Sequence, residues 1–329
     1  MRAFFLALVV AALAATAPSG ARPVLTPAGR IGIGWRENLW EIDKFGWMSF
    51  VAFDRTGRVI VSDAATAPDD VDDHVALWTF PGGRLIKRIG GGSPQALSPD
   101  GRHYATGREV RRLSDGAVVL GGTVGLIQVF TRDGRRVVQS GSGVGTRIVD
   151  LSGAHNARSL GSRSAFSLAV SPDGTTLASG HWDAVALTDV ATGTRRAMLR
   201  GIGRYVRGLS FSRDGRRLAV ATDAGGLEIW DVRRRVRLHR LDLPGGEVST
   251  PAFSPNGRWV AVGVYGTGAV WLIDVARGRV AANRRVSGIG CGSVAFSPDG
   301  RYLITPSTGG LITWPYDKGG TVRVFRVRG

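Results

Sequence analysis

Cysteine is almost absent from this sequence. Cys291 is the only one in 329 residues, so the chain cannot form an intramolecular disulfide. The sequence also lacks the GxxxxGK[ST] phosphate loop, the GxSxG nucleophile elbow and the HExxH zinc motif. After the first 21 residues no apolar stretch is long enough to cross a bilayer. These absences exclude a scaffold held together by disulfides. They also mean that the sequence does not indicate any enzyme class that is recognised by one of these short motifs.

Lysine is nearly as scarce. Three lysines stand against 40 arginines (43 − 3), and the formal net charge is +17. An excess of arginine over lysine is typical of a general bias in amino-acid composition. It is equally typical of a protein that uses arginine side chains for a function. A strongly basic surface nevertheless attracts polyanions in a salt-dependent way. For an exported protein the nearest polyanions are envelope polymers and anionic lipid head groups, so an anionic envelope polymer is a candidate partner and nucleic acid is disfavoured.

The N-terminal segment MRAFFLALVVAALAATAPSGA has the pattern of a secretory signal peptide. Arg2 is followed by an apolar run over residues 3–15, which is too short to span a bilayer, and then by small residues. We predict cleavage after Ala21 rather than after Ala17, because Pro18 follows the latter; the alternative is an uncleaved membrane anchor. The leader has no cysteine, which excludes a lipoprotein signal. Because exported eukaryotic proteins of this size more often carry disulfides, we expect a bacterial periplasmic or extracellular protein.

A short turn motif recurs through the chain. Examples are FSPDG, FSRDG and LSPDG, and seven copies align on a glycine: Gly57, Gly101, Gly134, Gly174, Gly215, Gly257 and Gly300. The successive spacings are 44, 33, 40, 41, 42 and 43 residues. A period near 40 is typical of propeller blades made of four short strands.

The chemistry of the motif predicts a β-hairpin in each copy. Alternating apolar residues precede the motif, and a second apolar strand follows it. Proline presets φ for a type I turn, Asp or Asn tolerates the next position, and glycine adopts the left-handed conformation without a Cβ clash. Unrelated turns would not recur at a regular spacing, so each copy is expected to join the first two strands of a blade.

One stretch allows a comparison with a known family. LAVATDAGGLEIWD, which ends at Trp230-Asp231, follows the strand–turn–strand pattern of the WD-repeat family, and GGTVRVFRV at 319–327 is close to it. Over about residues 45–329 the chain therefore resembles a WD40-repeat β-propeller with degenerate repeats. Other blades carry different pairs at the Trp-Asp position: Trp78-Thr79, Val149-Asp150, Thr188-Asp189 and Ile273-Asp274. The resemblance implies an architecture and says little about activity.

We predict an all-β fold, a seven-bladed β-propeller of four-stranded antiparallel blades. A ring of sheets must close, because a bare sheet edge promotes aggregation. The last repeat ends at its third strand, so we expect the segment IGIGWRENLWEI at 31–42 to supply the outer strand of that blade. The expected organisation is a signal peptide at 1–21, a short linker at 22–30 and the propeller at 31–329.

Two charged segments are weaker candidates for sites. The stretch DDVDDH offers oxygen and imidazole ligands for a metal, although a solvated acidic loop is favoured: Asp69, Asp70, Asp72, Asp73 and His74. The stretch VRRRVRLHR at 232–240 is expected in the hairpin between the third and fourth strands of one blade. On an extended ladder its alternate arginines share one side, so polyanion binding competes with a solvated strand edge as its role: Arg233, Arg234, Arg235 and Arg237.

The best candidate for partner binding is one face of the ring. Connections between second and third strands, and connections between blades, share a face around the central channel where ligands dock. Aromatic residues and arginine are enriched at interface hot spots. The candidate residues on this face are Trp47, His181, Trp182, Arg204, Tyr205, Tyr265, Trp314 and Tyr316; packing between neighbouring blades is the alternative role for them.

These observations predict an exported, non-catalytic interaction module that holds a protein or glycopolymer partner on its loop-rich face and needs no cofactor. The alternative is a propeller enzyme of the lactonase, hydrolase or quinone-dependent dehydrogenase type. In that case His181, Asp183 and Asp223 would have to converge at the mouth of the channel.

Overall fold

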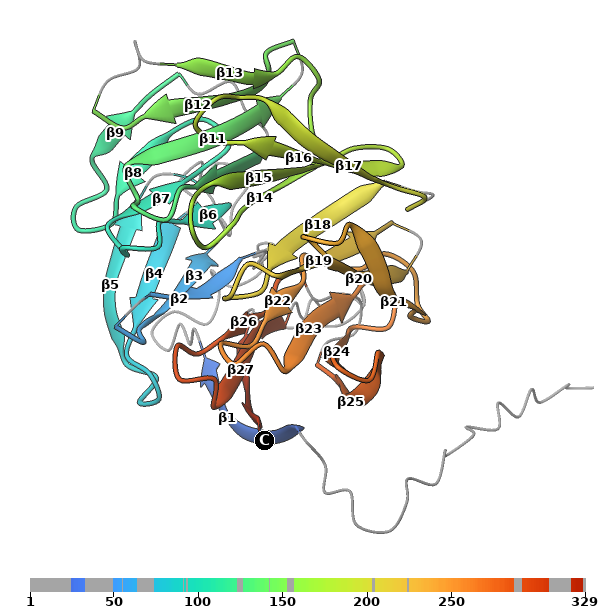
Figure 1. Cartoon of the computed structure of the whole chain (residues 1–329). Helices are drawn as coiled ribbons and strands as arrows, with labels where there is room; N and C mark the ends of the chain where they lie inside the picture. Colours follow the sequence, from blue (N-terminus) through green and yellow to red (C-terminus); the bar gives the residue numbers. More distant parts are fainter. Residues whose placement is uncertain are drawn as a thin grey trace, which may run out of the picture.

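The computed structural model places every described strand in one of seven four-stranded antiparallel sheets arranged around a common centre (Figure 1). It describes the side chains of residues 50–54, 56–60, 75–90, 92, 94–122, 127–141, 143–152, 157–202, 205–223, 225–286, 292–306 and 322–327. For residues 25–32, 61–63, 74, 307 and 321 it describes the backbone alone. The predicted seven-bladed propeller is therefore confirmed. Among these residues, none forms a helix of the length and apolarity that a bilayer crossing requires.

Blades 1 to 3 each use four strands that are consecutive in the chain. Blade 1 contains β2 (Val51–Phe53), β3 (Val59–Asp63), β4 (His74–Trp78) and β5 (Leu85–Gly90). Blade 2 contains β6 (Ala96–Leu97), β7 (His103–Ala105), β8 (Val110–Arg112) and β9 (Val118–Leu120). Blade 3 contains β10 (Ile127–Phe130), β11 (Arg136–Gly141), β12 (Gly145–Asp150) and β13 (Arg158–Gly161).

Blades 4 to 6 repeat this order. Blade 4 contains β14 (Ser167–Val170), β15 (Thr176–Gly180), β16 (Ala184–Asp189) and β17 (Arg195–Arg200). Blade 5 contains β18 (Val206–Phe211), β19 (Arg217–Thr222), β20 (Gly226–Asp231) and β21 (Val236–Asp242). Blade 6 contains β22 (Ala252–Phe253), β23 (Trp259–Val264), β24 (Ala269–Asp274) and β25 (Arg279–Arg285).

Blade 7 joins the two ends of the chain. It contains β26 (Ala295–Phe296), β27 (Tyr302–Ser307) and β28 (Thr321–Val327), and its outer strand is β1 (Leu25–Gly32). Strand β1 pairs antiparallel with β28 from Leu25↔Val327 to Gly32↔Thr321. The predicted closure is confirmed, but the strand begins six residues before the expected segment and occupies most of the expected linker. Residues 33–42 lie outside the described residues.

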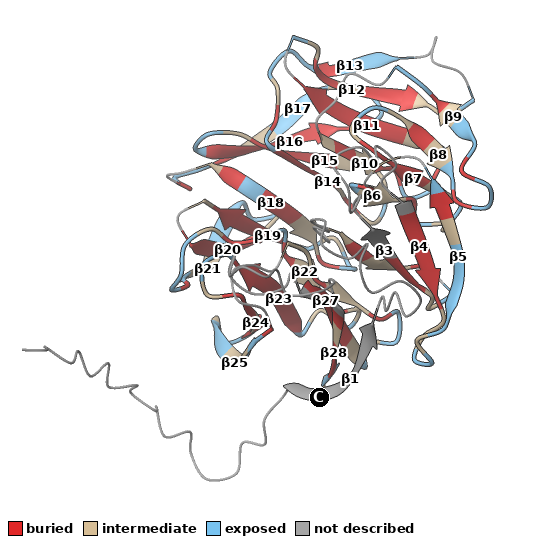
Figure 2. Cartoon of the chain, turned by 180° about the vertical axis from the view of Figure 1, so that it is seen from behind, coloured by how far each residue is buried: buried red, intermediate tan, exposed pale blue. Residues whose placement is uncertain are grey.

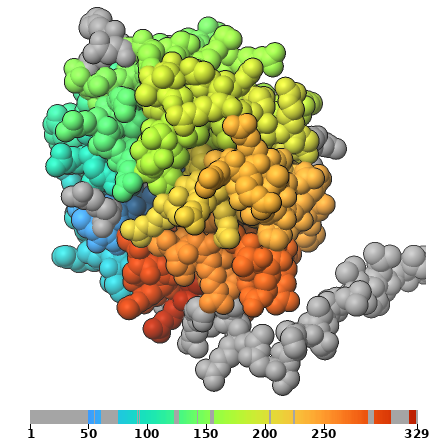
Figure 3. All heavy atoms as spheres, viewed as in Figure 1, coloured from blue at the N-terminus to red at the C-terminus, as the bar shows by residue number. Residues whose placement is uncertain are grey.

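The core consists of layers between neighbouring blades. Seven clusters of buried apolar residues each join two adjacent sheets, including one that joins blade 7 to blade 1. The middle strands are the most buried, whereas parts of the outer strands β5, β17 and β25 are exposed (Figure 2). In the space-filling view blade 7 lies beside blade 1, so the ring is closed (Figure 3).

Strand β19 shows how one sequence covers two interfaces. Leu218 and Val220 pack in the cluster shared with blade 4, while Ala219 and Ala221 pack in the cluster shared with blade 6. Alternate side chains of a strand point to opposite faces of its sheet, so both faces of a middle strand must be apolar. On the third strands of their blades, Trp78 and Trp230 are buried and Trp271 is half-buried.

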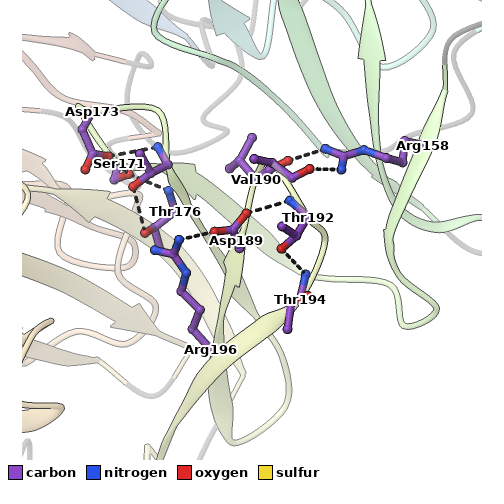
Figure 4. A network of polar contacts seen from close by, with 11 residues as sticks. Arg158, Ser171, Asp173, Thr176, Asp189, Val190, Thr192, Thr194 and Arg196 are labelled. Carbon is purple, nitrogen blue, oxygen red and sulfur yellow. Dashed lines mark hydrogen bonds and ion pairs between the residues drawn. The ribbon is translucent and has the colours of Figure 1, made fainter.

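The repeated turn joins the first two strands of each blade, as predicted. All seven turn glycines have positive φ, between 66° and 82°. In blade 4 the Ser171 hydroxyl donates to Asp173 Oδ1 (2.5 Å) and accepts from the Thr176 amide (2.9 Å), while the Thr175 amide donates to Asp173 Oδ1 (3.0 Å) (Figure 4). The Ser171 hydroxyl bond, followed by that of the Thr175 amide, holds the pKa of Asp173 below its usual value.

The aspartates at the Trp-Asp position close the turn between third and fourth strands. The Asp189 carboxylate accepts from the Thr192 amide (2.7 Å) and pairs with Arg196 (Figure 4). The Asp231 carboxylate accepts from the Arg234 amide (2.7 Å) in the same way. A further arginine, Arg158 of blade 3, donates to the carbonyls of Val190 and Ala191 in this turn of blade 4 and so ties the two blades together.

Removal of the closing strand should destabilise the ring. A chain that begins at residue 33 leaves the β28 edge without a partner, whereas a chain that begins at residue 22 keeps β1. Seven residue pairs are lost. At about 0.5–1 kcal/mol for each backbone hydrogen bond, we expect the free energy of unfolding to fall by roughly 3–7 kcal/mol. Denaturant unfolding followed by circular dichroism measures the difference, and equal midpoints for the two chains would contradict the closure.

The turn glycines allow a second, matched test. Gly134 and Gly174 have φ of 66° and 75°. A Cβ on Gly134 would lie 2.8 Å from Asp100 Cγ of the neighbouring blade, whereas a Cβ on Gly174 would have nothing within 4 Å. Both alanine substitutions place a non-glycine residue at positive φ, which lowers the stability by about 1–3 kcal/mol. Only Gly134→Ala adds a steric clash, with Asp100. We expect Gly134→Ala to have the lower denaturation midpoint; the reverse order would show that the turns of blades 2 and 3 are not packed as described.

Candidate interaction surface

Three aromatic side chains from neighbouring blades meet at one rim of the propeller. Phe166 immediately precedes β14, Trp182 lies in the connection between β15 and β16, and Tyr205 immediately precedes β18. The Tyr205 ring centroid lies 4.0 Å from that of Trp182 and 4.6 Å from that of Phe166, with edge-on ring planes in both pairs. We call these three residues the aromatic patch.

Backbone hydrogen bonds anchor the patch to the strands below it. The Phe166 amide donates to the Gly180 carbonyl (2.8 Å), the Val206 amide donates to the His181 carbonyl (3.2 Å), and the Asp223 amide donates to the Tyr205 carbonyl (3.2 Å). These bonds link the two connections to the ends of β15 and β19. The aromatic side chains are therefore held by rigid strands even though they lie on loops.

The patch is exposed to solvent. Trp182 is 59% exposed and Phe166 is 43% exposed, which makes Trp182 the most exposed large hydrophobic side chain among the described residues. Core aromatics in this protein are buried, as Trp230 at 5% shows. Large aromatic side chains that are exposed and contact each other typically mark a binding surface. The fold alone would be more stable if these rings were buried in the core.

Charged side chains extend the surface toward blade 6. The Arg207 guanidinium lies 6.0 Å from the Tyr205 ring centroid and its Nε is 3.1 Å from Glu247 Oε1. The Glu247 carbonyl in turn accepts from the Tyr265 amide (2.9 Å), and Tyr265 is 39% exposed in the connection between β23 and β24. The surface therefore runs across three consecutive blades.

His181 supports the patch from beneath. It is half-buried, and its Nε2 lies 3.2 Å from Ser179 Oγ. Burial is the largest cause that holds the pKa of His181 below its usual value; the nearby Arg163 also lowers it, against a hydrogen bond with the Ser164 backbone that raises it. The ring is therefore neutral at pH 7, and its role in this surface is packing and hydrogen bonding rather than charge.

The structure brings together only part of the predicted face. Among the predicted residues, His181, Trp182 and Tyr205 lie together and Tyr265 is connected to them through Glu247 and Arg207. The other predicted residues lie outside the described residues: Trp47, Arg204, Trp314 and Tyr316. Sequence reasoning did not single out Phe166 or Glu247. The signal that finds both is position, because each lies in a connection between blades, as Tyr205 does.

The arginine run at 232–240 takes a different shape from the expected ladder. Residues 232–235 form the turn between β20 and β21, and Arg235 has φ of 59°. The alternation expected for an extended strand therefore does not hold at Arg233 and Arg235. Arg237 Nη1 lies 2.9 Å from Glu228 Oε1, a carboxylate whose side chain is 1% exposed, and donates to the Gly201 carbonyl (3.1 Å). Arg237 is thus committed to a structural contact, whereas Arg233, Arg234 and Arg235 are exposed.

Most of the candidate metal-ligating stretch at 69–74 is not described by the structure. Residues 69–73 lie outside the described residues, and for His74 the structure describes only the backbone in β4. In the described part of the chain no three His, Cys, Asp or Glu side chains gather as a metal-binding group. Asp183 and Asp223 accordingly form no such group with His181.

The blade number, the strand order and the shared connections define the class of this protein, a seven-bladed β-propeller of repeated four-stranded units. A family described as "WD domain, G-beta repeat" matches residues 156–186, which run from the start of β13 into β16 and include Phe166 and Trp182. This match and the WD-repeat relatives below support the resemblance to WD40-repeat propellers that the sequence pattern implied.

Three relatives are similar to parts of the chain. The WD repeat-containing protein SL1-17 of Schistosoma mansoni is 30% identical over 172 residues, which cover 51% of this chain and 46% of that protein. The small ribosomal subunit protein RACK1y of Oryza sativa subsp. japonica is 27% identical over 165 residues (48% and 46%). Telomerase protein component 1 of Rattus norvegicus is 28% identical over 159 residues (47% and 6%). The chain thus spans less than half the length of each of these relatives.

The position of Trp182 predicts a small effect on stability. Trp182→Ala removes an exposed ring and one aromatic contact, so we expect a loss of at most about 1 kcal/mol. Trp230→Ala removes a buried ring between blades 4 and 5, and we expect a loss of about 3–5 kcal/mol. Denaturant unfolding of the two variants provides the comparison. A cost for Trp182→Ala as large as for Trp230→Ala would place Trp182 in the packing and not in a binding surface.

Proposed function

We propose that this WD40-repeat propeller is an exported, non-catalytic interaction module that holds a protein partner on the face formed by the connections between blades and between second and third strands. The observation that carries the proposal is the aromatic patch: large apolar rings are exposed, in mutual contact and held by rigid strands. Hot spots of protein interfaces are enriched in Trp, Tyr and Arg, and an exposed apolar cluster rimmed by charge fits that composition.

The surface offers both an apolar anchor and a polar rim. Trp182 and Phe166 would supply the anchor, since their apolar area is removed from water when a partner covers them. The Arg207–Glu247 pair and the exposed Asp183 supply charges of both signs around it. Such rim charges set orientation and association rate more than affinity. The patch is therefore expected to dominate the binding free energy.

The names of the relatives support an interaction role. One is named as a protein of the small ribosomal subunit and another as a component of telomerase, so both are parts of larger assemblies. A scaffold role for this chain is in keeping with these names and with the WD40 propeller fold.

Export is the second part of the proposal. The N-terminal pattern predicts removal of residues 1–21. Cleavage there leaves Leu25, the first residue of the closing strand, in the mature chain. The signal peptide and the ring closure are therefore compatible, and the mature propeller is expected in the periplasm or outside the cell.

Crosslinked affinity capture from an envelope extract tests the interaction. The bait is the mature protein, compared with a Trp182→Ala/Tyr205→Ala variant. Because hot-spot truncations cost about 2 kcal/mol or more each, we expect the partner to be recovered with the parent and reduced at least about 30-fold with the variant.

The matched control removes exposed apolar side chains elsewhere. Ile86 on β5 is 45% exposed and Val118 on β9 is 48% exposed, so Ile86→Ala/Val118→Ala removes exposed apolar area away from the patch. The control is expected to retain the partner. Recovery that is equal for all three baits, or lost equally in both variants, would reject the aromatic patch as the binding surface.

A further inference from the structure

The seven repeated turns lie at the opposite end of the blades from the aromatic patch. Each turn joins a first strand to a second strand, whereas the patch lies where second strands end and first strands begin. Neighbouring first strands contact each other around the centre of the propeller (Figure 1). We call the seven turns around Gly57, Gly101, Gly134, Gly174, Gly215, Gly257 and Gly300 the turn ring.

Contacts join the successive turns of blades 1 to 5, and those of blades 6 and 7. A Cβ on Gly101 would lie 3.4 Å from Asp54 Cβ of blade 1, and one on Gly134 would lie 2.8 Å from Asp100 Cγ of blade 2. The Arg132 guanidinium of blade 3 donates to the Pro172 carbonyl of blade 4 (2.7 Å). Further contacts of this kind link blade 4 to blade 5 and blade 6 to blade 7. The side chains that the turns expose therefore lie on one surface.

That surface carries arginine at a repeated position. The residue directly after the turn glycine is arginine in six turns and threonine in one: Arg58, Arg102, Arg135, Thr175, Arg216, Arg258 and Arg301. Arginine makes up 40 (43 − 3) of 329 residues, so at that frequency fewer than one of seven such positions would carry it. The bias of the whole composition toward arginine does not account for this pattern.

The turn itself does not need the arginine side chain. What the turn uses at this position is the backbone amide, which donates to the Asp Oδ1 two residues before it. The distance is 3.0 Å for Arg216 to Asp214 and 3.0 Å for Thr175 to Asp173. Threonine makes the same backbone contact at the same distance. The geometry of the turn therefore does not explain why arginine occupies this position in six turns.

Most of these guanidinium groups are exposed and weakly paired. The side chains of Arg102 and Arg301 are 77% and 75% exposed, and each lies 3.9 or 3.8 Å from the carboxylate of its own turn, which is longer than a hydrogen bond. Those carboxylates already accept from the turn serine and a backbone amide. Arg58 differs, because its Nε lies 2.6 Å from the buried Asp54. Exposed pairs of this kind contribute little to stability, so the donors are available to a ligand.

We propose that the turn ring binds a flexible, linear polyanion that carries phosphate groups. A ring of guanidinium groups at repeated intervals suits a chain of repeated anionic groups better than a single small ion, because each further contact is made at high effective concentration. Arginine favours phosphate, since its planar donors pair with two phosphate oxygens at once. This site lies on a different surface from the aromatic patch and is independent of the proposed protein partner.

The test is a binding titration of inorganic polyphosphate to the mature protein at several salt concentrations, with orthophosphate as the single-ion comparison. For flexible strands the slope of log K against log salt is about −0.7 per neutralised charge. Because Arg58 is paired with Asp54, the other five arginines predict a slope of about −3.5, and orthophosphate is expected to bind too weakly to measure. Equal molar affinity for orthophosphate would reduce the site to an adventitious ion only and overturn the proposal.

The decisive variant replaces four ring arginines with the residue that blade 4 already uses, Arg102→Thr/Arg135→Thr/Arg216→Thr/Arg301→Thr. The control removes the same charge from exposed positions on outer and edge-adjacent strands, Arg195→Thr/Arg200→Thr/Arg279→Thr/Arg326→Thr. We expect the ring variant to bind polyphosphate about 100-fold more weakly, with a slope of about −0.7, and the control to keep a slope of about −3.5.

Equal weakening of both variants would overturn the proposal, because it would show a diffuse effect of net charge. If polyglutamate bound as tightly as polyphosphate, and the ring variant lost affinity for both to the same extent, the assignment to phosphate would be overturned. If the fourfold ring variant does not fold, Arg102→Thr/Arg301→Thr takes its place with an expected slope of about −2.1. Unfolding midpoints of the variants separate a lost site from a lost fold.

Discussion

The pairing of β1 with β28 is the contact on which the architecture depends. Each blade buries both faces of its sheet against its neighbours, so the arrangement is stable only if no blade lacks a neighbour. Strand β1 brings the first described strand of the chain into the last blade and links the two ends of the fold. The paired residues are almost 300 positions apart in the sequence. Their pairing therefore holds the ring closed between its last and first blades.

The repeated turn separates structural from functional demands. In blades 2 to 7 a Ser or Thr hydroxyl, an Asp or Asn side chain and the glycine hold the hairpin, and blade 1 uses Asp54 and Thr56 instead of the hydroxyl–carboxylate order. Outside blade 1, where Arg58 pairs with Asp54, the residue after the glycine takes part through its backbone, so its side chain is open to selection. Connections at the other end of the blades differ in length and composition, and there the aromatic patch is built from three different connections. The two faces of one ring can therefore serve two kinds of partner.

The candidate site was predicted only in part, and the reason is geometric. Trp182 and Tyr205 were placed on the right face because the strand order of a propeller blade fixes which connections lie at which end. Phe166 was missed because its sequence neighbours do not distinguish it from a core residue. Its contact with Tyr205 depends on the angle between blades 4 and 5, and no local pattern encodes that angle. The arginine ladder expected at 233–237 failed for a local reason, since a four-residue turn with a left-handed Arg235 replaces the extended backbone.

The period of the turn motif determined the number of blades, the hairpin at each repeat and the need for an N-terminal strand in the last blade, because local turn chemistry and strand alternation act over a few residues and repeat with the chain. Only the tertiary structure decided that this strand is Leu25–Gly32, that Phe166, Trp182 and Tyr205 meet at one rim, and that Arg237 is occupied by Glu228 while the ring arginines are exposed. These outcomes depend on register and on the spacing between sheets. Both are set by how whole blades pack, since each contact joins residues that are distant in the sequence.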